Sequence, residues 1–169
     1  MLNIGEIVTI ADKEWIILDK NDGAVMCFSK TPFERMRFDT NNYAESNVHK
    51  YLHRNVLPTL IAEVGKDALF GVEIDLTSED GLKDYGCVVN KIGLLTASMY
   101  RAYSEVIEAH NIRNTFWLST PWSMRRRGGG TYNCIVTSNG NLFSESISDY
   151  YAIHPFCVIK ESALESLKE

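Results

Sequence analysis

The chain has 169 residues, of which 45% are hydrophobic and 11% aromatic, and its formal net charge at pH 7 is -5. This size and composition predict one globular domain over residues 1–160, followed by a short tail at 161–169. The negative charge argues against general nucleic-acid binding, which needs a basic face to neutralise phosphates. No apolar run approaches the roughly 18 residues of a membrane-spanning helix, so we expect a soluble protein.

The N-terminal residues alternate between apolar and polar side chains, as is typical of β-strands. The predicted strands are Glu6–Ile10, Glu14–Asp19 and Ala24–Ser29. Turn residues at 11–12 and 21–23 separate them, which predicts a three-stranded meander. The polar residues 31–43 are expected to form a covering loop.

Two helices are predicted in the middle of the chain. The first begins after Ser46, whose hydroxyl can accept a first-turn amide, and runs to about Leu60, with Pro58 shortening or kinking it. Its buried face is marked by apolar residues at four-residue spacing, namely Val48, Leu52, Val56 and Leu60. The second runs from its cap Thr96 to about Ala109.

Neither the histidines nor the carboxylates have the spacing of a known metal site. His49 and His53 lie one helical turn apart, but Lys50 stands where a zinc protease needs its glutamate base. The acidic turn at residues 78–81 follows a predicted strand, Phe70–Asp75, and lacks the ligand spacing of an EF-hand. We therefore expect a solvated histidine pair, and neither a metal nor a cofactor.

The four cysteines are Cys27, Cys87, Cys134 and Cys157, and they contain no Cys-x-x-Cys pair. This excludes a zinc ribbon and predicts free thiols in a reducing compartment. Cys134 and Cys157 are expected on neighbouring strands.

The C-terminal part of the chain alternates between strands and loops. Strands are predicted at 115–119, 132–137, 142–147 and 153–159. Asn139-Gly140 predicts a hairpin, because both residues accept a positive φ. The three consecutive glycines at 128–130 predict a surface loop with a flexible second half.

Several short motifs carry a family resemblance. They are Trp117-Leu118-Ser119, Tyr132-x-x-x-Val136, the Asn139-Gly140 turn, Tyr151-x-Ile153-x-Pro155-Phe156-x-x-x-Lys160, and earlier Gly5, Val8, Ile10, Glu14, Trp15, Leu18, Asp19, Tyr43, Ala44, Ser46 and Leu52. Together they resemble a family of bacterial and phage domains of unknown function with a C-type-lectin-like fold, distantly related to formylglycine-generating enzymes. The resemblance covers nearly the whole chain, although His154 stands where that family usually has arginine.

The resemblance implies an α+β fold with two helices packed on small antiparallel sheets. Glu6 and Asp12 stand where a signal peptide would have a basic and then an apolar segment, so we expect a location in the cytoplasm or on a phage particle. The motifs of calcium-binding, sugar-binding relatives are missing. Residues 127–134 resemble the Arg-Gly-Gly-Ser-aromatic-x-Cys stretch of formylglycine-generating enzymes, which use copper and a second cysteine five residues on. Asn139 occupies that second position here, so a degenerate oxidase is one alternative.

Residues 119–132, called here the Trp/Arg/Gly loop, are the expected binding site. Tryptophan and arginine are enriched at binding hot spots, and this region is the usual ligand-facing surface of C-type-lectin-like folds. The candidate ligand-binding residues are Trp122, Arg125, Arg126, Arg127, Tyr132, Asn133, Tyr150 and Tyr151. We expect a noncatalytic module that binds a protein or cell-surface ligand. Alternatives are solvated charge without function, or a mobile-element inhibitor that blocks a host protein or its nucleic-acid channel.

Overall fold

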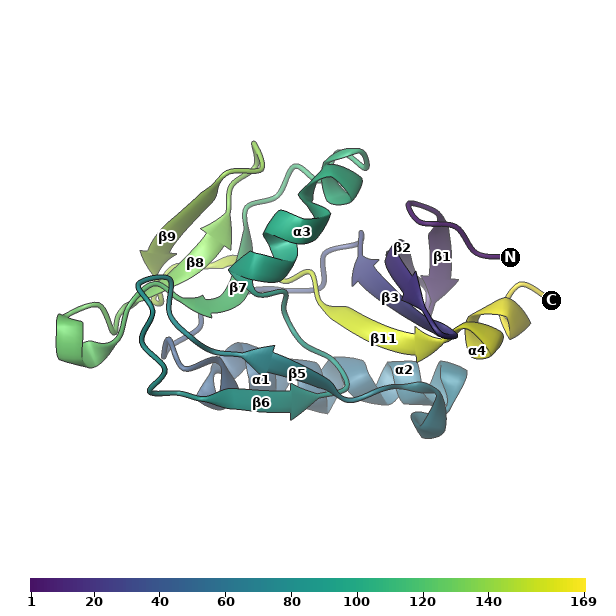
Figure 1. The fold of residues 1–169 in the computed structure, drawn as a ribbon, viewed down its shortest axis with the longest axis horizontal. Coiled ribbons are helices and arrows are strands. Elements are labelled where there is room, and N and C mark those ends of the chain that lie inside the picture. Colours follow the sequence, from purple (N-terminus) through teal and green to yellow (C-terminus); the bar gives the residue numbers. More distant parts are fainter.

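The computed structural model describes residues 1–169 and has an α+β fold (Figure 1). A four-stranded antiparallel sheet has the order β1 (Ile7–Ile10), β2 (Lys13–Asn21), β3 (Ala24–Ser29) and β11 (Phe156–Lys160). A five-stranded sheet has the order β4 (Arg35–Met36), β10 (Tyr151–Ala152), β7 (Phe116–Pro121), β8 (Tyr132–Val136) and β9 (Leu142–Ser146). β5 (Val72–Asp75) and β6 (Cys87–Asn90) pair by themselves.

The predicted meander is confirmed, since β1, β2 and β3 pair in sequence. Ala11 and Asp12 have φ values of 50° and 62°, and Asp22 and Gly23 have 49° and 77°. Two consecutive positive φ values are what a tight hairpin needs to match the twist of its strands. The sheets are not purely antiparallel, because β10 runs parallel to β7. No hairpin joins these two strands, so nothing in the connection requires them to be antiparallel.

The first predicted helix begins as expected and continues further. Ser46 Oγ accepts a hydrogen bond from the His49 amide at 3.1 Å, and the four predicted core residues are buried. The helical segment consists of α1 (Asn47–Tyr51), a π-helical turn (Leu52–Val56) and α2 (Leu57–Val64). A proline has no amide hydrogen and crowds the preceding turn, and the wider π-turn before Pro58 accommodates it without ending the helix.

The second predicted helix is also confirmed. α3 (Ala97–Glu108) is capped by Thr96, whose Oγ1 accepts from the Met99 amide at 3.0 Å. α3 packs against β2 of one sheet and β7 of the other, and so bridges the two sheets.

The closing strand joins the N-terminal sheet, because β11 pairs with β3. Residues 153–155 carry the chain from β10 to β11, that is, from one sheet to the other. Cys157 therefore lies opposite Cys27, and the expectation that Cys134 and Cys157 are neighbours is wrong. All four cysteines are free thiols, and Cys87 is exposed.

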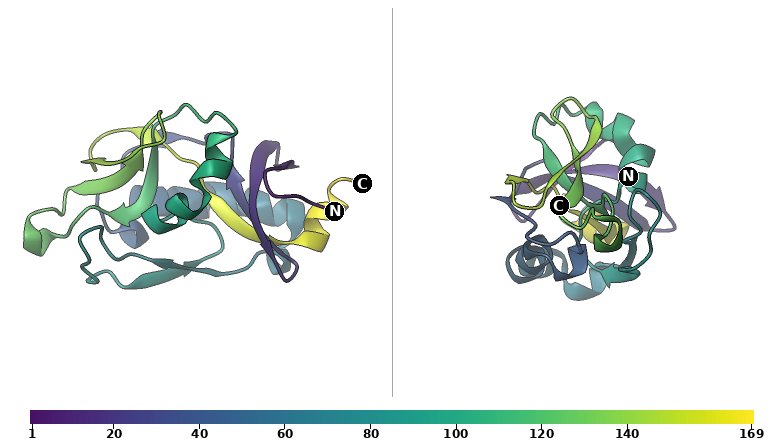
Figure 2. Two further views of the ribbon diagram at one scale, coloured as in Figure 1. Left: turned by 45° about the horizontal axis from the view of Figure 1, so that its top comes forward. Right: turned by 90° about the vertical axis from the view of Figure 1, so that its left-hand side faces the viewer.

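The chain ends lie close together, and Figures 1 and 2 agree on this. The terminal ammonium group of Met1 lies 3.7 Å from Glu165, and Lys168 pairs with Glu6. The tail forms a short helix, α4 (Glu161–Ser166), docked on the core through Leu164. The core includes buried residues from Leu2 to Leu164, with Trp15 and Trp117 the largest. None of the helices has the length and apolar character needed to cross a membrane.

Candidate functional site

The Trp/Arg/Gly loop connects β7 to β8 and projects at one end of the molecule, at the left of Figure 1 in green. Trp122 and Tyr132 are each 46% exposed, whereas Trp117 is completely buried in β7. The Trp117 indole donates a hydrogen bond to the Met36 carbonyl at 2.8 Å. Trp117 therefore belongs to the core, and Trp122 lies at the surface, as expected for a candidate ligand-binding residue.

The loop is folded tightly on itself. Arg125–Arg127 form a single 3-10 turn, which ends at Gly128 with a φ of 77°. A Cβ atom on Gly129 would lie 2.4 Å from Ser123 Cβ, closer than any real contact. Gly128 is needed for its left-handed backbone and Gly129 for its close approach to Ser123. The glycines thus allow tight packing of the loop, whereas we expected them to make it flexible.

The buried side chain of Asn41 holds both ends of the loop. Asn41 Nδ2 donates to the Ser123 carbonyl at 2.7 Å and to the Tyr132 carbonyl at 3.2 Å, while its Oδ1 accepts from the Tyr85 hydroxyl at 2.5 Å. Sequence reasoning placed Asn41 in a covering loop and missed this role. Its contacts join segments more than 40 residues apart, and no local pattern marks them.

Two of the three loop arginines are paired within the molecule. Arg126 Nε lies 3.0 Å from Asp84 Oδ2, and its Nη2 donates to Asp84 Oδ1 at 3.2 Å. Arg127 Nη1 lies 3.3 Å from Asp80 Oδ2 and donates to the Asp80 carbonyl at 2.9 Å. Solvated charge was the alternative for all three arginines, and it is corrected for Arg126 and Arg127, because Asp84 and Asp80 pair with them.

Asp80 also ties this acidic turn to the start of the loop. Its carboxylate accepts hydrogen bonds from the hydroxyls of Ser123 and Ser78, both at 2.5 Å. These two hydroxyls, followed by Arg127, hold the pKa of Asp80 below its usual value. The carboxylate is therefore ionised near neutral pH and keeps its hold on the loop.

Arg125 is the loop arginine that forms no ion pair. It lines a pocket of about 330 Å³ together with Thr40, Asn41, Tyr85, Gly128, Gly130 and Thr131. No carboxylate lines this pocket, whereas a guanidinium and several hydroxyls do. The pocket offers hydrogen-bond donors and positive charge, which suits a carboxylate or another anionic group.

The other candidate residues differ in position. Asn133 is completely buried, and its Nδ2 donates to the Leu118 carbonyl at 2.7 Å, so its proposed role at a binding surface is corrected. Tyr151 is half-buried, with its ring 5.1 Å from that of Trp117. Tyr150 is 55% exposed, and its carbonyl accepts from Arg35 on β4. Neither tyrosine lines the Arg125 pocket.

Cys134, the residue shared with the oxidase motif, is buried in β8. Burial raises the pKa of its thiol to about 12, so the thiol is protonated at neutral pH and is a poor nucleophile or metal ligand. Asn139 lies exposed in the turn between β8 and β9. The His49 and His53 rings stack with centroids 4.1 Å apart and are half-buried, not fully solvated as expected.

Comparison with known proteins finds no matching family model, curated protein or solved structure.

Proposed function

We propose that the chain is a noncatalytic binding module with a C-type-lectin-like fold over residues 1–160. The loop presents Arg125 at the rim of a donor-lined pocket, with the exposed Trp122 on the same loop. This combination supports recognition of an acidic segment of a protein or surface ligand. A carboxylate of the ligand would occupy the Arg125 pocket, and an apolar group would cover Trp122.

The internal contacts of the loop favour binding because they order it in advance. Asn41 anchors both ends, and Arg126 and Arg127 are held by Asp84 and Asp80. A loop that is already ordered loses less conformational entropy when a partner binds. Arg126 and Arg127 thus serve to position the loop, while Trp122 and Arg125 make the contacts.

The test is capture of partners from the source-cell lysate by the full chain and by variants. Trp122→Ala and Arg125→Ala should each weaken specific capture strongly without eliminating it, while leaving the melting temperature nearly unchanged. Matched controls are Phe143→Ala, an exposed aromatic on β9, and Arg54→Ala, an exposed cation on the helical segment. Unchanged capture by both loop variants, or equal losses with the controls, would place the binding face elsewhere.

Salt dependence separates a charged contact from an apolar one. Capture by the intact chain should weaken as salt rises, because surface charges are screened over about 10 Å at 0.1 M ionic strength. Arg125→Ala should remove most of that dependence. An inhibitor that blocks a host protein would use the same loop, and the identity of the captured partner would distinguish it from a surface-binding module.

A further inference from the structure

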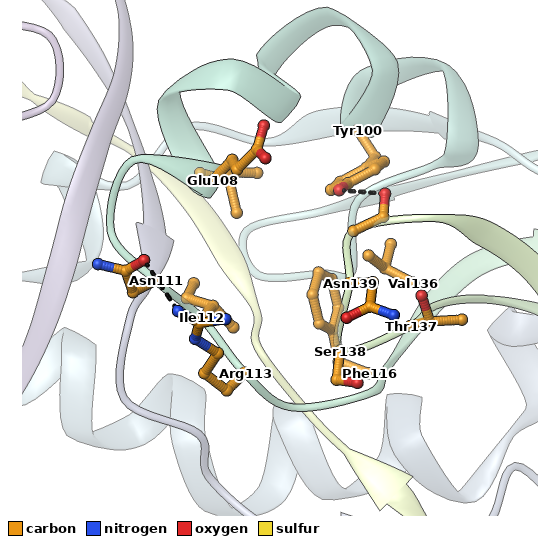
Figure 3. A pocket seen from close by; sticks show the side chains of 12 residues that line it. Tyr100, Glu108, Asn111, Ile112, Arg113, Phe116, Val136, Thr137, Ser138 and Asn139 are labelled. Atoms are coloured by element: carbon orange, nitrogen blue, oxygen red, sulfur yellow. Dashed lines mark hydrogen bonds between the residues drawn. The ribbon is translucent and has the colours of Figure 1, made fainter.

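A second hollow lies at the C-terminal end of β8, between the end of α3 and the turn joining β8 to β9 (Figure 3). We call it the α3 hollow, and its volume is about 260 Å³. Its floor consists of Ile107, Phe116 and Val136, which are at most 3% exposed. The Tyr100 hydroxyl closes one wall by donating to the Gly140 carbonyl at 2.9 Å.

The rim of the α3 hollow carries one charge of each sign. Glu108 comes from the last turn of α3, and Arg113 follows the bend after it. Asn111 lies in this bend with a φ of 54°, and Figure 3 shows Glu108 above it and Arg113 below it, across the hollow from the β8–β9 turn. Neither charge forms an ion pair, and Arg113 has only a 3.5 Å contact with Asn111 Oδ1.

Size and chemistry together limit what fits this hollow. Its volume is below the roughly 300–1,000 Å³ of pockets for drug-sized ligands, so the occupant is small. The apolar floor favours a ligand with a hydrocarbon side chain, because packing against the floor removes the apolar surface of that side chain from water. The two rim charges favour a ligand with an adjacent cation and anion, because such a ligand can form a charge-assisted hydrogen bond with each of them.

We propose that the α3 hollow binds a free α-amino acid with an apolar side chain. Its ammonium group faces Glu108, its carboxylate faces Arg113, and its side chain lies on the floor formed by Phe116, Val136 and Ile107. This site is separate from the Trp/Arg/Gly loop and does not depend on the function proposed for that loop.

The experiment is a titration of the isotopically labelled full chain with L-leucine, followed by amide NMR shifts. Saturable shifts should concentrate at residues 107–113 and 137–140. Leucinamide lacks the carboxylate, N-acetyl-leucine lacks the ammonium group, and glycine lacks the side chain. Each should bind at least about tenfold more weakly than leucine, as expected for loss of a charge-assisted hydrogen bond or of apolar burial. Absence of saturable shifts with leucine, or equal binding of the analogues, would overturn the proposal.

Substitutions at the rim assign the two charges. Glu108→Gln and Arg113→Gln should each weaken leucine binding at least about tenfold. Glu105→Gln is the matched control, because Glu105 is exposed on the same helix and does not line the hollow. In Glu108→Gln, leucine and N-acetyl-leucine should bind equally, since the group that recognises the ammonium is gone. Unchanged leucine binding in both rim variants would also overturn the proposal.

Discussion

Acidification should destabilise the protein through the buried ring of His154. The ring is 1% exposed and packs against Phe28 and Phe116. Its Nδ1 lies 2.8 Å from the Ser29 carbonyl, which only accepts, so Nδ1 carries the hydrogen. Its Nε2 lies 3.1 Å from Asn114 Nδ2, which donates, so Nε2 is the acceptor of a neutral imidazole. A second proton on Nε2 would point at the amide hydrogens of Asn114, and the resulting positive charge would lie between apolar rings.

The magnitude follows from the pKa. Burial lowers the pKa of His154 from 6.5 to about 4, with the Ser29 carbonyl opposing the shift. Between these values the unfolded chain binds the proton more readily than the folded one, so stability is complete above about pH 6.5 and falls as the pH drops towards 4. At about pH 5 the unfolding free energy of the protein should therefore be about 2 kcal/mol lower than at neutral pH because of His154, since each pKa unit is worth about 1.4 kcal/mol.

Urea unfolding from about pH 7.5 to pH 5 measures this loss. His49 titrates in the same range, because burial, followed by the nearby His53, lowers its pKa to about 4. The comparison of the intact chain with His154→Gln therefore isolates the buried ring, and the variant should lack the ~2 kcal/mol component. Asn114→Asp should place an acceptor beside Nε2, raise the His154 pKa and flatten the pH dependence. Parallel pH profiles for the intact chain and His154→Gln would refute this reasoning.

Four further substitutions test the loop and the core by thermal and urea unfolding. Trp117→Ala should cost about 3–5 kcal/mol through cavity formation, whereas Trp122→Ala should leave stability nearly unchanged; the reverse pattern would mean that the two rings are wrongly assigned. Asn41→Ala should cost about 1–3 kcal/mol and speed proteolysis of the loop, because it leaves buried carbonyls unpaired; a loop that stays protected would contradict this. Cys134→Ser should cost at most a few kcal/mol and retain partner binding, and selective loss of an activity in the folded variant would revive the oxidase alternative.

Much of the local structure was predictable because its causes lie within a few residues. The Asn139-Gly140 turn, the Ser46 and Thr96 caps and the alternating strands of the meander all follow from backbone preferences and short-range hydrogen bonds. Trp122 was expected at the surface as a candidate ligand-binding residue, and it is indeed exposed. Asn133 shows the limit: β8 is buried on both faces from residue 133 onward, so alternation along the strand does not indicate an exposed side.

The sequence by itself determined the types of the main helices and strands and the location of the Trp/Arg/Gly loop. It predicted neither β6 nor the two-residue strands β4 and β10, and it started the closing strand at 153 instead of Phe156. Only the tertiary structure decided which charges of that loop remain free, because Arg126 and Arg127 meet aspartates more than 40 residues away. The same holds for Asn41 between the two ends of the loop and for Cys157 opposite Cys27. Such contacts depend on how the sheets and helices pack. No short sequence pattern predicts them, because the residues that pair are far apart in the chain.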